Sequence, residues 1–134
     1  MAKKNVDARI AELQRQIAEI RVKSVEAGEF RLVDKAGRVR AVLELTRSGP
    51  RLAMMHEDGT VGLEVSLGAG NPAVRLADET GQTRVFLGAA RDAASIALAD
   101  GKGAQRTFMG VSRSGKTTIK LYDAKQRVAW TAPG

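Results

Sequence analysis

Hydrophobic residues near the start of the chain recur every three or four positions. Successive members of this series are 4, 3, 4 and 3 residues apart: Val6, Ile10, Leu13, Ile17 and Ile20. This is the spacing of the a and d positions of a coiled coil, and the stripe is too narrow to cover itself. We predict a parallel coiled-coil oligomerisation helix over residues 1–28, ending at Gly28. Its a positions are β-branched and its d positions include both Leu and Ile, which leans away from a dimer, so we expect three helices. The alternative is an amphipathic helix folded against its own domain.

From residue 29 onward the pattern changes to strict alternation, and it repeats every 22 residues. Apolar residues mark the same place in each repeat, the last one after 23 residues: Leu32, Met54, Leu76, Leu98 and Leu121. A turn signature follows each of them, formed by Asp34 with Gly37, His56 with Gly59, Asp78 with Gly81, Asp100 with Gly103, and Asp123 with Gln126. Aspartate suits the first position of a type I turn and glycine the fourth.

A second turn signal falls between the repeats, at residues 48–50, 70–72, 92–94 and 114–116. Each repeat is therefore predicted as a β-hairpin with one apolar and one polar face. Such a meander cannot bury its apolar face alone. We predict a mainly β domain over residues 29–134, in which five 22-residue hairpin units form a trimeric β-prism. The alternative is a monomeric β-solenoid.

The unit Leu-x-Asp-x-x-Gly-x-x-Arg is clearest at residues 32–40 and 76–84. With the heptad helix before it, this unit resembles uncharacterised bacterial coiled-coil plus β-hairpin-repeat proteins. The design is similar to trimeric phage fibre or adhesin stalk segments. The resemblance implies an architecture and carries over no active-site residues. His56, Gly62 and the last repeat depart from the pattern.

The composition supports a partner chain. The sequence has 134 residues, no Cys, one His and only 4% aromatic residues, so disulfides, Cys-ligated zinc and thiolate catalysis are excluded. Few bulky side chains are present to cover the strands. No secretory signal or membrane-spanning run is visible, which predicts a cytoplasmic protein, with a phage or injection-system component as the alternative.

Residues 110–117, GVSRSGKT, match the phosphate-binding loop pattern G-x-x-x-x-G-K-[ST]. That loop needs a helix directly after its lysine, whereas the residues after Lys116 are β-branched and alternating. We therefore interpret the segment as a hairpin, and nucleotide binding remains the weaker alternative. His56 and the repeat aspartates are interpreted as turn residues rather than metal ligands or catalytic acids. No metal, cofactor or catalytic residue is predicted.

The excess of positive charge lies on the repeats. Residues 1–29 have a net charge of +1 and residues 30–134 a net charge of +6. Alternation places six cations outward at equivalent positions, namely Arg31, Arg40, Arg75, Arg84, Arg106 and Lys120. These basic stripes predict a docking surface for an acidic protein or a polyanion such as nucleic acid. The alternative is that they keep the sheet soluble and pair internally, as Arg40 could with Asp34.

Together these patterns predict a non-enzymatic homotrimeric structural or scaffold protein. It would act as a stalk, a fibre segment or an organising module that presents partners in a threefold array. A polyanion- or acidic-partner-binding module is the first alternative, and a nucleotide-binding protein the second.

Overall fold

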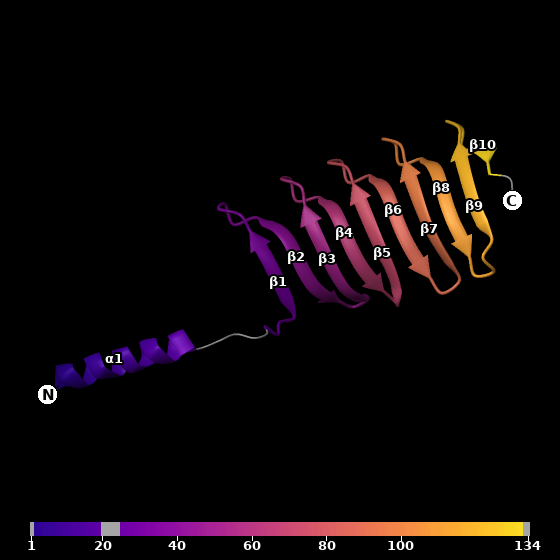
Figure 1. Cartoon of the computed structure of the whole chain (residues 1–134). Helices are drawn as coiled ribbons and strands as arrows, with labels where there is room; N and C mark the ends of the chain where they lie inside the picture. Colours follow the sequence, from indigo (N-terminus) through magenta and orange to yellow (C-terminus); the bar gives the residue numbers. More distant parts are fainter. Residues whose placement is uncertain (1, 20–24, 133–134) are drawn as a thin grey trace.

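The computed structural model describes residues 2–19 and 25–132 of the chain (Figure 1). One helix precedes a single antiparallel sheet, and strand order in the sheet follows the sequence from β1 to β10. The predicted mainly β class is thus confirmed. The elements are α1 (Ala2–Glu19), β1 (Glu29–Val33), β2 (Val39–Thr46), β3 (Gly49–Met55), β4 (Val61–Gly68), β5 (Asn71–Ala77), β6 (Thr83–Ala90), β7 (Ala93–Ala99), β8 (Gln105–Ser112), β9 (Thr117–Tyr122) and β10 (Val128–Thr131).

Helix α1 occupies most of the segment with the heptad pattern. Its described part runs to Glu19, and residues 25–28 are irregular, so the predicted helix end at Gly28 is not observed. Ile20 and the side chain of Ile17 lie outside the described residues. Within the described part, α1 makes no contact with any strand. A helix folded against its own sheet is therefore not the observed arrangement.

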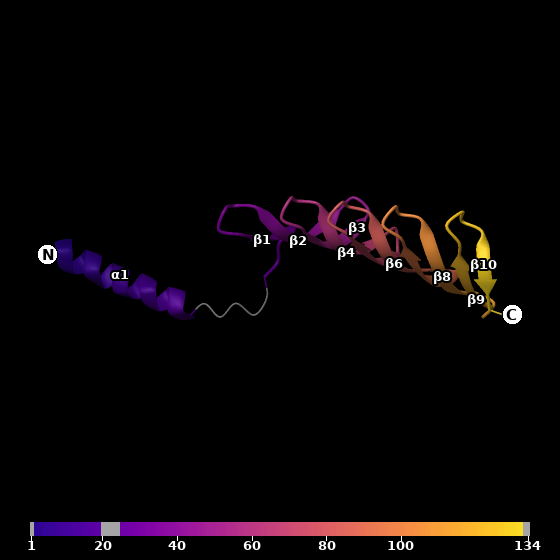
Figure 2. The ribbon, with the colours of Figure 1, turned by 90° about the horizontal axis from the view of Figure 1, so that it is seen from above.

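The sheet is open. Each strand pairs only with its neighbours in the chain, and β1 and β10 form the two ends of the stack. Figures 1 and 2 show the hairpins side by side in one twisted layer. This antiparallel meander differs from the alternative prediction of a monomeric β-solenoid, whose coils stack as parallel strands.

Two kinds of turn lie at the two opposite edges of the sheet. The first edge, which we term the Asp-turn edge, is formed by the loops that begin at Asp34, His56, Asp78, Asp100 and Asp123. The other, the short-turn edge, is formed by residues 47–48, 69–70, 91–92 and 112–116. The predicted second turns thus begin one or two residues earlier than expected. Pro50 and Pro72 lie in the strands that follow.

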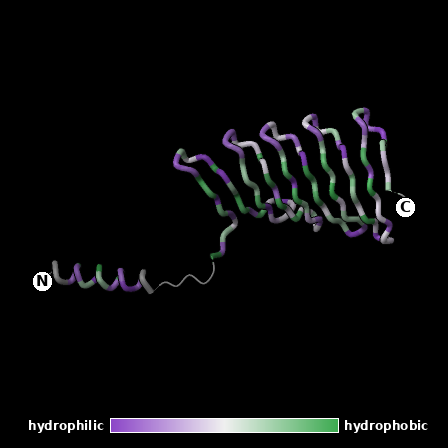
Figure 3. The backbone as a smooth tube through the Cα atoms, turned by 45° about the horizontal axis from the view of Figure 1, so that its top comes forward, coloured by the Kyte–Doolittle hydropathy of each residue, from purple (hydrophilic) through white to green (hydrophobic). Residues whose placement is uncertain are grey.

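Strand register separates apolar from polar residues. On one face, Leu52 pairs with Val65 and Val65 with Val74, while on the other face Ala53 pairs with Glu64 and Glu64 with Arg75. The same division continues through Leu87 and Ile96. Figure 3 shows the strands alternating in hydropathy and the turns as mostly hydrophilic. The period-two pattern of the sequence is therefore realised as two chemically distinct faces.

Burial within the single chain is slight. Among the described residues, only Val42 and Ala53 are buried apolar residues, and both lie on the polar face. Ala53 is shielded by its neighbours there, Val42 on β2 and Glu64 on β4. The apolar face contributes no buried side chain in the described part, so the chain has no core of the usual kind.

Candidate functional site: an uncovered apolar sheet face

The apolar face is exposed along the whole sheet. Its exposed large side chains have exposed fractions from 37% for Leu76 to 72% for Leu45, and other members of the face are half-buried, namely Leu52, Leu63, Val74, Val85 and Ile119. The other exposed members are Phe30, Leu32, Leu43, Met54, Val65, Leu67, Leu87, Ile96, Leu98, Met109, Val111, Leu121 and Trp130. Monomeric proteins rarely expose a continuous apolar surface of this extent, and one that does so usually has an interaction partner.

A shallow open hollow lies in the middle of this face. Its volume is about 400 Å³, and its apolar lining includes Val74, Leu87 and Ile96. Ala89 and Ala94, which face each other across the β6–β7 pair, also line it and have short side chains. The hollow is almost free of polar groups, so it suits an apolar side chain rather than a charged substrate.

Helix α1 carries a second uncovered apolar surface. Val6, Ile10 and Leu13 are 57%, 48% and 46% exposed. These three residues are the described members of the predicted coiled-coil stripe. Around them, Glu12 accepts hydrogen bonds from Arg15 and Gln16, as is usual on a solvated helix surface. The helix therefore presents a narrow apolar stripe with a polar surround.

The polar face is held together by ion pairs across strands. Arg51 donates to Glu44 on β2 at 2.7 Å and to Glu64 on β4 at 2.9 Å. Arg75 on β5 approaches Glu64 at 3.6 Å. Burial alone would raise the pKa of Glu64, but the hydrogen bond from Arg51 and the nearby arginine charges together hold that pKa below its usual value. These ion pairs across neighbouring strands support the register of β2 to β5, and the residues that form them already have partners within the chain.

Farther along the polar face, aromatic rings lie over glycines. Phe86 covers Gly88 and Phe108 covers Gly110, and a Cβ added at either glycine would lie 2.8 Å from the ring. The sequence shows this as Phe-x-Gly in two successive repeats. A ring over a strand glycine shields backbone that has no side chain of its own.

The predicted Asp turns share one geometry. In the third repeat the N–H of Gly81 donates to the carbonyl of Asp78 at 2.9 Å, and the Asp78 carboxylate accepts from the N–H groups of Thr80 and Gln82. Gly81 has a φ of +81°, which favours glycine. Gln126 takes the same conformation in the last repeat, at a φ of +61°. Asp34, Asp100 and Asp123 repeat these bonds.

Hydrogen bonding lowers the pKa of each turn aspartate. For Asp78 the largest cause is the Thr80 hydroxyl, and for Asp34, Asp100 and Asp123 it is a backbone N–H. An arginine also contributes in each case. These carboxylates make their hydrogen bonds and ion pairs within their own hairpins. They are spread one per repeat, which matches their interpretation as turn formers.

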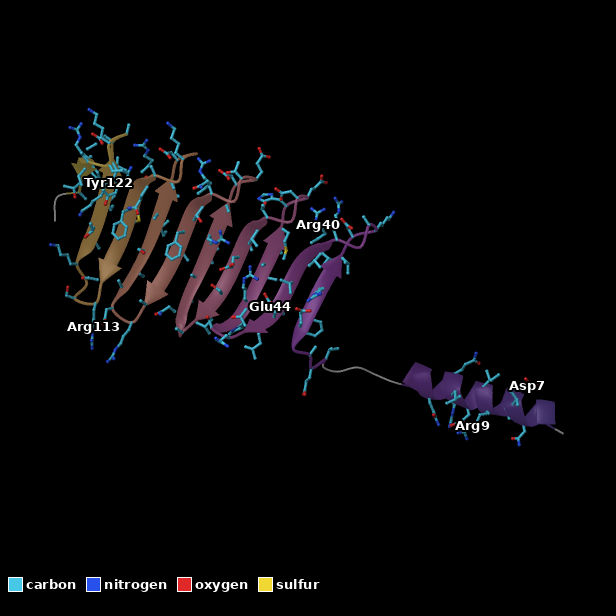
Figure 4. All side chains as sticks on the ribbon, turned by 180° about the vertical axis from the view of Figure 1, so that it is seen from behind. Asp7, Arg9, Arg40, Glu44, Arg113 and Tyr122 are labelled. Carbon is cyan, nitrogen blue, oxygen red and sulfur yellow. The ribbon has the colours of Figure 1, made fainter. Side chains whose placement is uncertain are left out.

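Most of the predicted basic stripe is paired within the chain. Arg40, Arg84 and Arg106 lie 3.6, 3.3 and 2.6 Å from the aspartates that begin their own turns. Arg31 pairs with Glu29, and Arg75 with Glu64. Lys120 has no carboxylate within ion-pair distance in residues 2–19 and 25–132. Figure 4 shows Arg40 near the Asp-turn edge and Glu44 within the polar face.

In the second repeat, His56 and Gly62 stand where the repeat pattern has the paired Asp and Arg. The ring of His56 lies over Gly62, at the position of the repeat arginine, and a Cβ there would be 2.5 Å from Nε2. His56 Nε2 also lies 3.3 Å from the carbonyl of Ala77 in the next repeat. In the third repeat the Nε–H of Arg84 makes the corresponding bond to Ala99 at 2.9 Å. His56 and Gly62 therefore depart from the pattern together, because the His56 ring fills the space that a side chain at position 62 would need.

The GKT segment forms a hairpin. Residues 112–116 connect β8 to β9, closed by a bond from the N–H of Ser112 to the carbonyl of Lys116 at 3.0 Å. Thr117 begins strand β9, so no helix N-terminus follows the lysine. The backbone arrangement that holds phosphates in such loops is therefore not formed.

The short-turn edge carries arginines that are not among the predicted site residues. Arg47, Arg91 and Arg113 occupy equivalent places 22 or 44 residues apart, and Figure 4 shows Arg113 at the edge opposite Arg40. Arg113 pairs with Asp92 at 3.4 Å. In the described ranges, Arg47 and Arg91 have no such partner. The 22-residue spacing was the signal that could have found them.

The described residues contain no cluster of three or more potential metal ligands. No helix among them is long and apolar enough to cross a membrane. Neither a family model nor a curated protein matches this sequence. The arrangement of apolar and charged surfaces therefore carries the functional argument.

Proposed function

We propose that this protein is a non-enzymatic homotrimeric scaffold. In this arrangement three sheets turn their apolar faces toward a threefold axis as a β-prism, and three copies of α1 form a parallel coiled coil at one end. The observation that carries the proposal is the exposure of the apolar face along every hairpin. Two separate elements of the chain, α1 and the sheet, each have an uncovered apolar surface that a second apolar surface would bury.

The surface area of the chain supports this need. The single chain exposes 10454 Å², whereas a compact monomer of 14.3 kDa exposes roughly 6,800 Å². The difference, about 3,600 Å², exceeds what many stable oligomers bury per chain. A second copy of the chain supplies an apolar face of matching length, because both faces have the same ten strands.

Three chains suit this sheet better than two. Two stacked sheets would cover their apolar faces in a sandwich, but the stripe of α1 has β-branched residues at d, Val6 and Ile20, as well as at a, and this combination favours three helices. The chain enters the sheet at β1, the end of the strand stack. A coiled coil on the threefold axis can therefore continue directly into three sheets whose strands stack along that axis.

A prism of this kind serves as a short rod. The polar faces point outward with their charges mostly paired, and the ends of the rod are the coiled coil and the β10 strands. Such a body holds whatever is attached to it in threefold symmetry. The internal pairing of the repeat arginines favours this role over the binding of a polyanion by the basic stripes.

The test is the molar mass in solution, measured by light scattering after size exclusion. The expected mass is three times 14.3 kDa. Replacing Ile10 and Ile17 with Asp should abolish the trimer, because it buries charges in the coiled coil. Ala11→Asp with Ala18→Asp, on the outer side of the same helix, is the matched control and should remain trimeric. A soluble, folded wild-type monomer would refute the proposal.

A further inference from the structure

Unpaired charges lie on both turn edges of the sheet, as carboxylates and lysines on the Asp-turn edge and as cations on the short-turn edge. On the Asp-turn edge, Glu57, Asp58 and Glu79 are exposed carboxylates, and on the short-turn edge Arg47 and Arg91 are exposed guanidinium groups. In the described part of the chain none of the five lies within ion-pair distance of an opposite charge. The carboxylate of Asp58 accepts hydrogen bonds from the N–H and the hydroxyl of Thr60, and no lysine or arginine pairs with it in the described residues. All other carboxylates of the sheet itself are paired.

Threefold symmetry would bring these two edges together. This step rests on the proposed function, in which the strands run across each side of the prism and their turns form its corners. A rotation about the axis places the same sheet on each side in the same direction. Each corner therefore joins the Asp-turn edge of one chain to the short-turn edge of the next, a heterologous contact that closes after three copies.

We propose that the short-turn edge of one chain binds the Asp-turn edge of a second copy through Arg47 and Arg91 on one side and Glu57, Asp58 and Glu79 on the other. The partner is a second copy of this chain. These charges add attraction to the contact that the threefold rotation imposes, whereas an association that joined two like edges would bring equal charges together.

The heights of these groups along the strand stack agree with the proposal. The acidic turns connect β3 to β4 and β5 to β6, and the basic turns connect β2 to β3 and β6 to β7. At about 4.8 Å per strand, the basic turns are roughly 19 Å apart and enclose the acidic pair, which are roughly 10 Å apart. Lys35, Lys102 and Lys125 lie in Asp turns outside this central span. The turns of Lys35 and Lys102 are as close to Arg47 and Arg91 along the stack as the acidic turns are, so these lysines oppose part of the attraction.

Charge reversal tests the contact. The variant Glu57→Lys with Glu79→Lys makes both edges basic, and Arg47→Glu with Arg91→Glu makes both acidic. We expect each to raise the trimer dissociation constant at least about tenfold, because contacts at three corners become repulsive. The variant with all four changes exchanges the charges between edges and should return the constant to within a few-fold of wild type.

Sedimentation equilibrium at low and at high salt measures these constants. The fourfold variant is the matched control, because it keeps all four substitutions while it restores opposite charges across each corner. Rescue by the fourfold variant, with a weaker effect at high salt, supports the contact. A wild-type trimer with unaffected charge variants, or a fourfold variant worse than either pair, overturns the contact and leaves the scaffold in place. A wild-type monomer overturns both.

Discussion

Removing one side chain from the centre of the apolar face tests whether that face is buried between chains. Leu87 lies on β6 between Val74 and Ile96 and is 46% exposed in the single chain. Full burial of a leucine is worth about 1.5–3 kcal/mol, so covering the exposed half contributes about 1 kcal/mol per chain. Leu87→Ala should therefore cost roughly 3 kcal/mol per trimer, which raises the trimer dissociation constant about a hundredfold.

The neighbouring residue provides the control. Phe86 is also large and apolar and is 41% exposed, but it points to the polar face and covers Gly88. Phe86→Ala should lower the free energy of unfolding yet leave the dissociation constant within a few-fold of wild type. Both constants come from sedimentation equilibrium over a range of concentrations. Equal effects of the two substitutions on association would refute the reasoning that only one face is shared.

Three further predictions concern the turns, and all are measured by urea unfolding of the chain. The pKa of Asp78 lies below its ordinary value of 3.8, so the stability that Asp78 contributes is present above about pH 3.8 and is lost as the pH falls through the lowered pKa. Asp78→Asn should make the free energy of unfolding depend less on pH in this range. An unchanged dependence on pH would contradict the assignment. Gly62→Arg alone should destabilise the protein because the new side chain meets the His56 ring. Gly62→Arg combined with His56→Asp should regain stability, because it restores the Asp–Arg pair of the repeat pattern. A combined variant that is no more stable than the single one would contradict this. Ala69 has a φ of +50°, so Ala69→Gly should raise the free energy of unfolding by about 1 kcal/mol, and a decrease would show that the left-handed backbone carries no strain.

Much of the sheet could be predicted because its signals are local. The 22-residue spacing of Asp34, Asp78 and Asp100 gave the positions of the turns, and alternation gave the two faces. Antiparallel neighbours then follow, since short turns can only join adjacent strands in that way. The short turns were placed slightly late because Pro50 and Pro72 were read as turn residues, whereas each lies in the strand after its turn.

The charges were harder to predict than the strands. An outward arginine looks available in a sequence, but whether it is free depends on a carboxylate several residues or a whole strand away. Arg106 is occupied by Asp100 at 2.6 Å, and Arg51 lies between two glutamates. Arg47 and Arg91 stay unpaired within the described residues, because the short turn of Arg47 holds no carboxylate and the carboxylate beside Arg91, Asp92, pairs with Arg113 instead.

What the sequence determined by itself is the alternation, the turn chemistry and the heptad stripe, because each depends on residues close together in the chain and on the fixed periods of strands and helices. Only the tertiary structure decided that the sheet stays open with its apolar face uncovered, and that the repeat arginines form ion pairs within the sheet. Those outcomes depend on register and on distances between strands, which bring together groups that no local pattern connects.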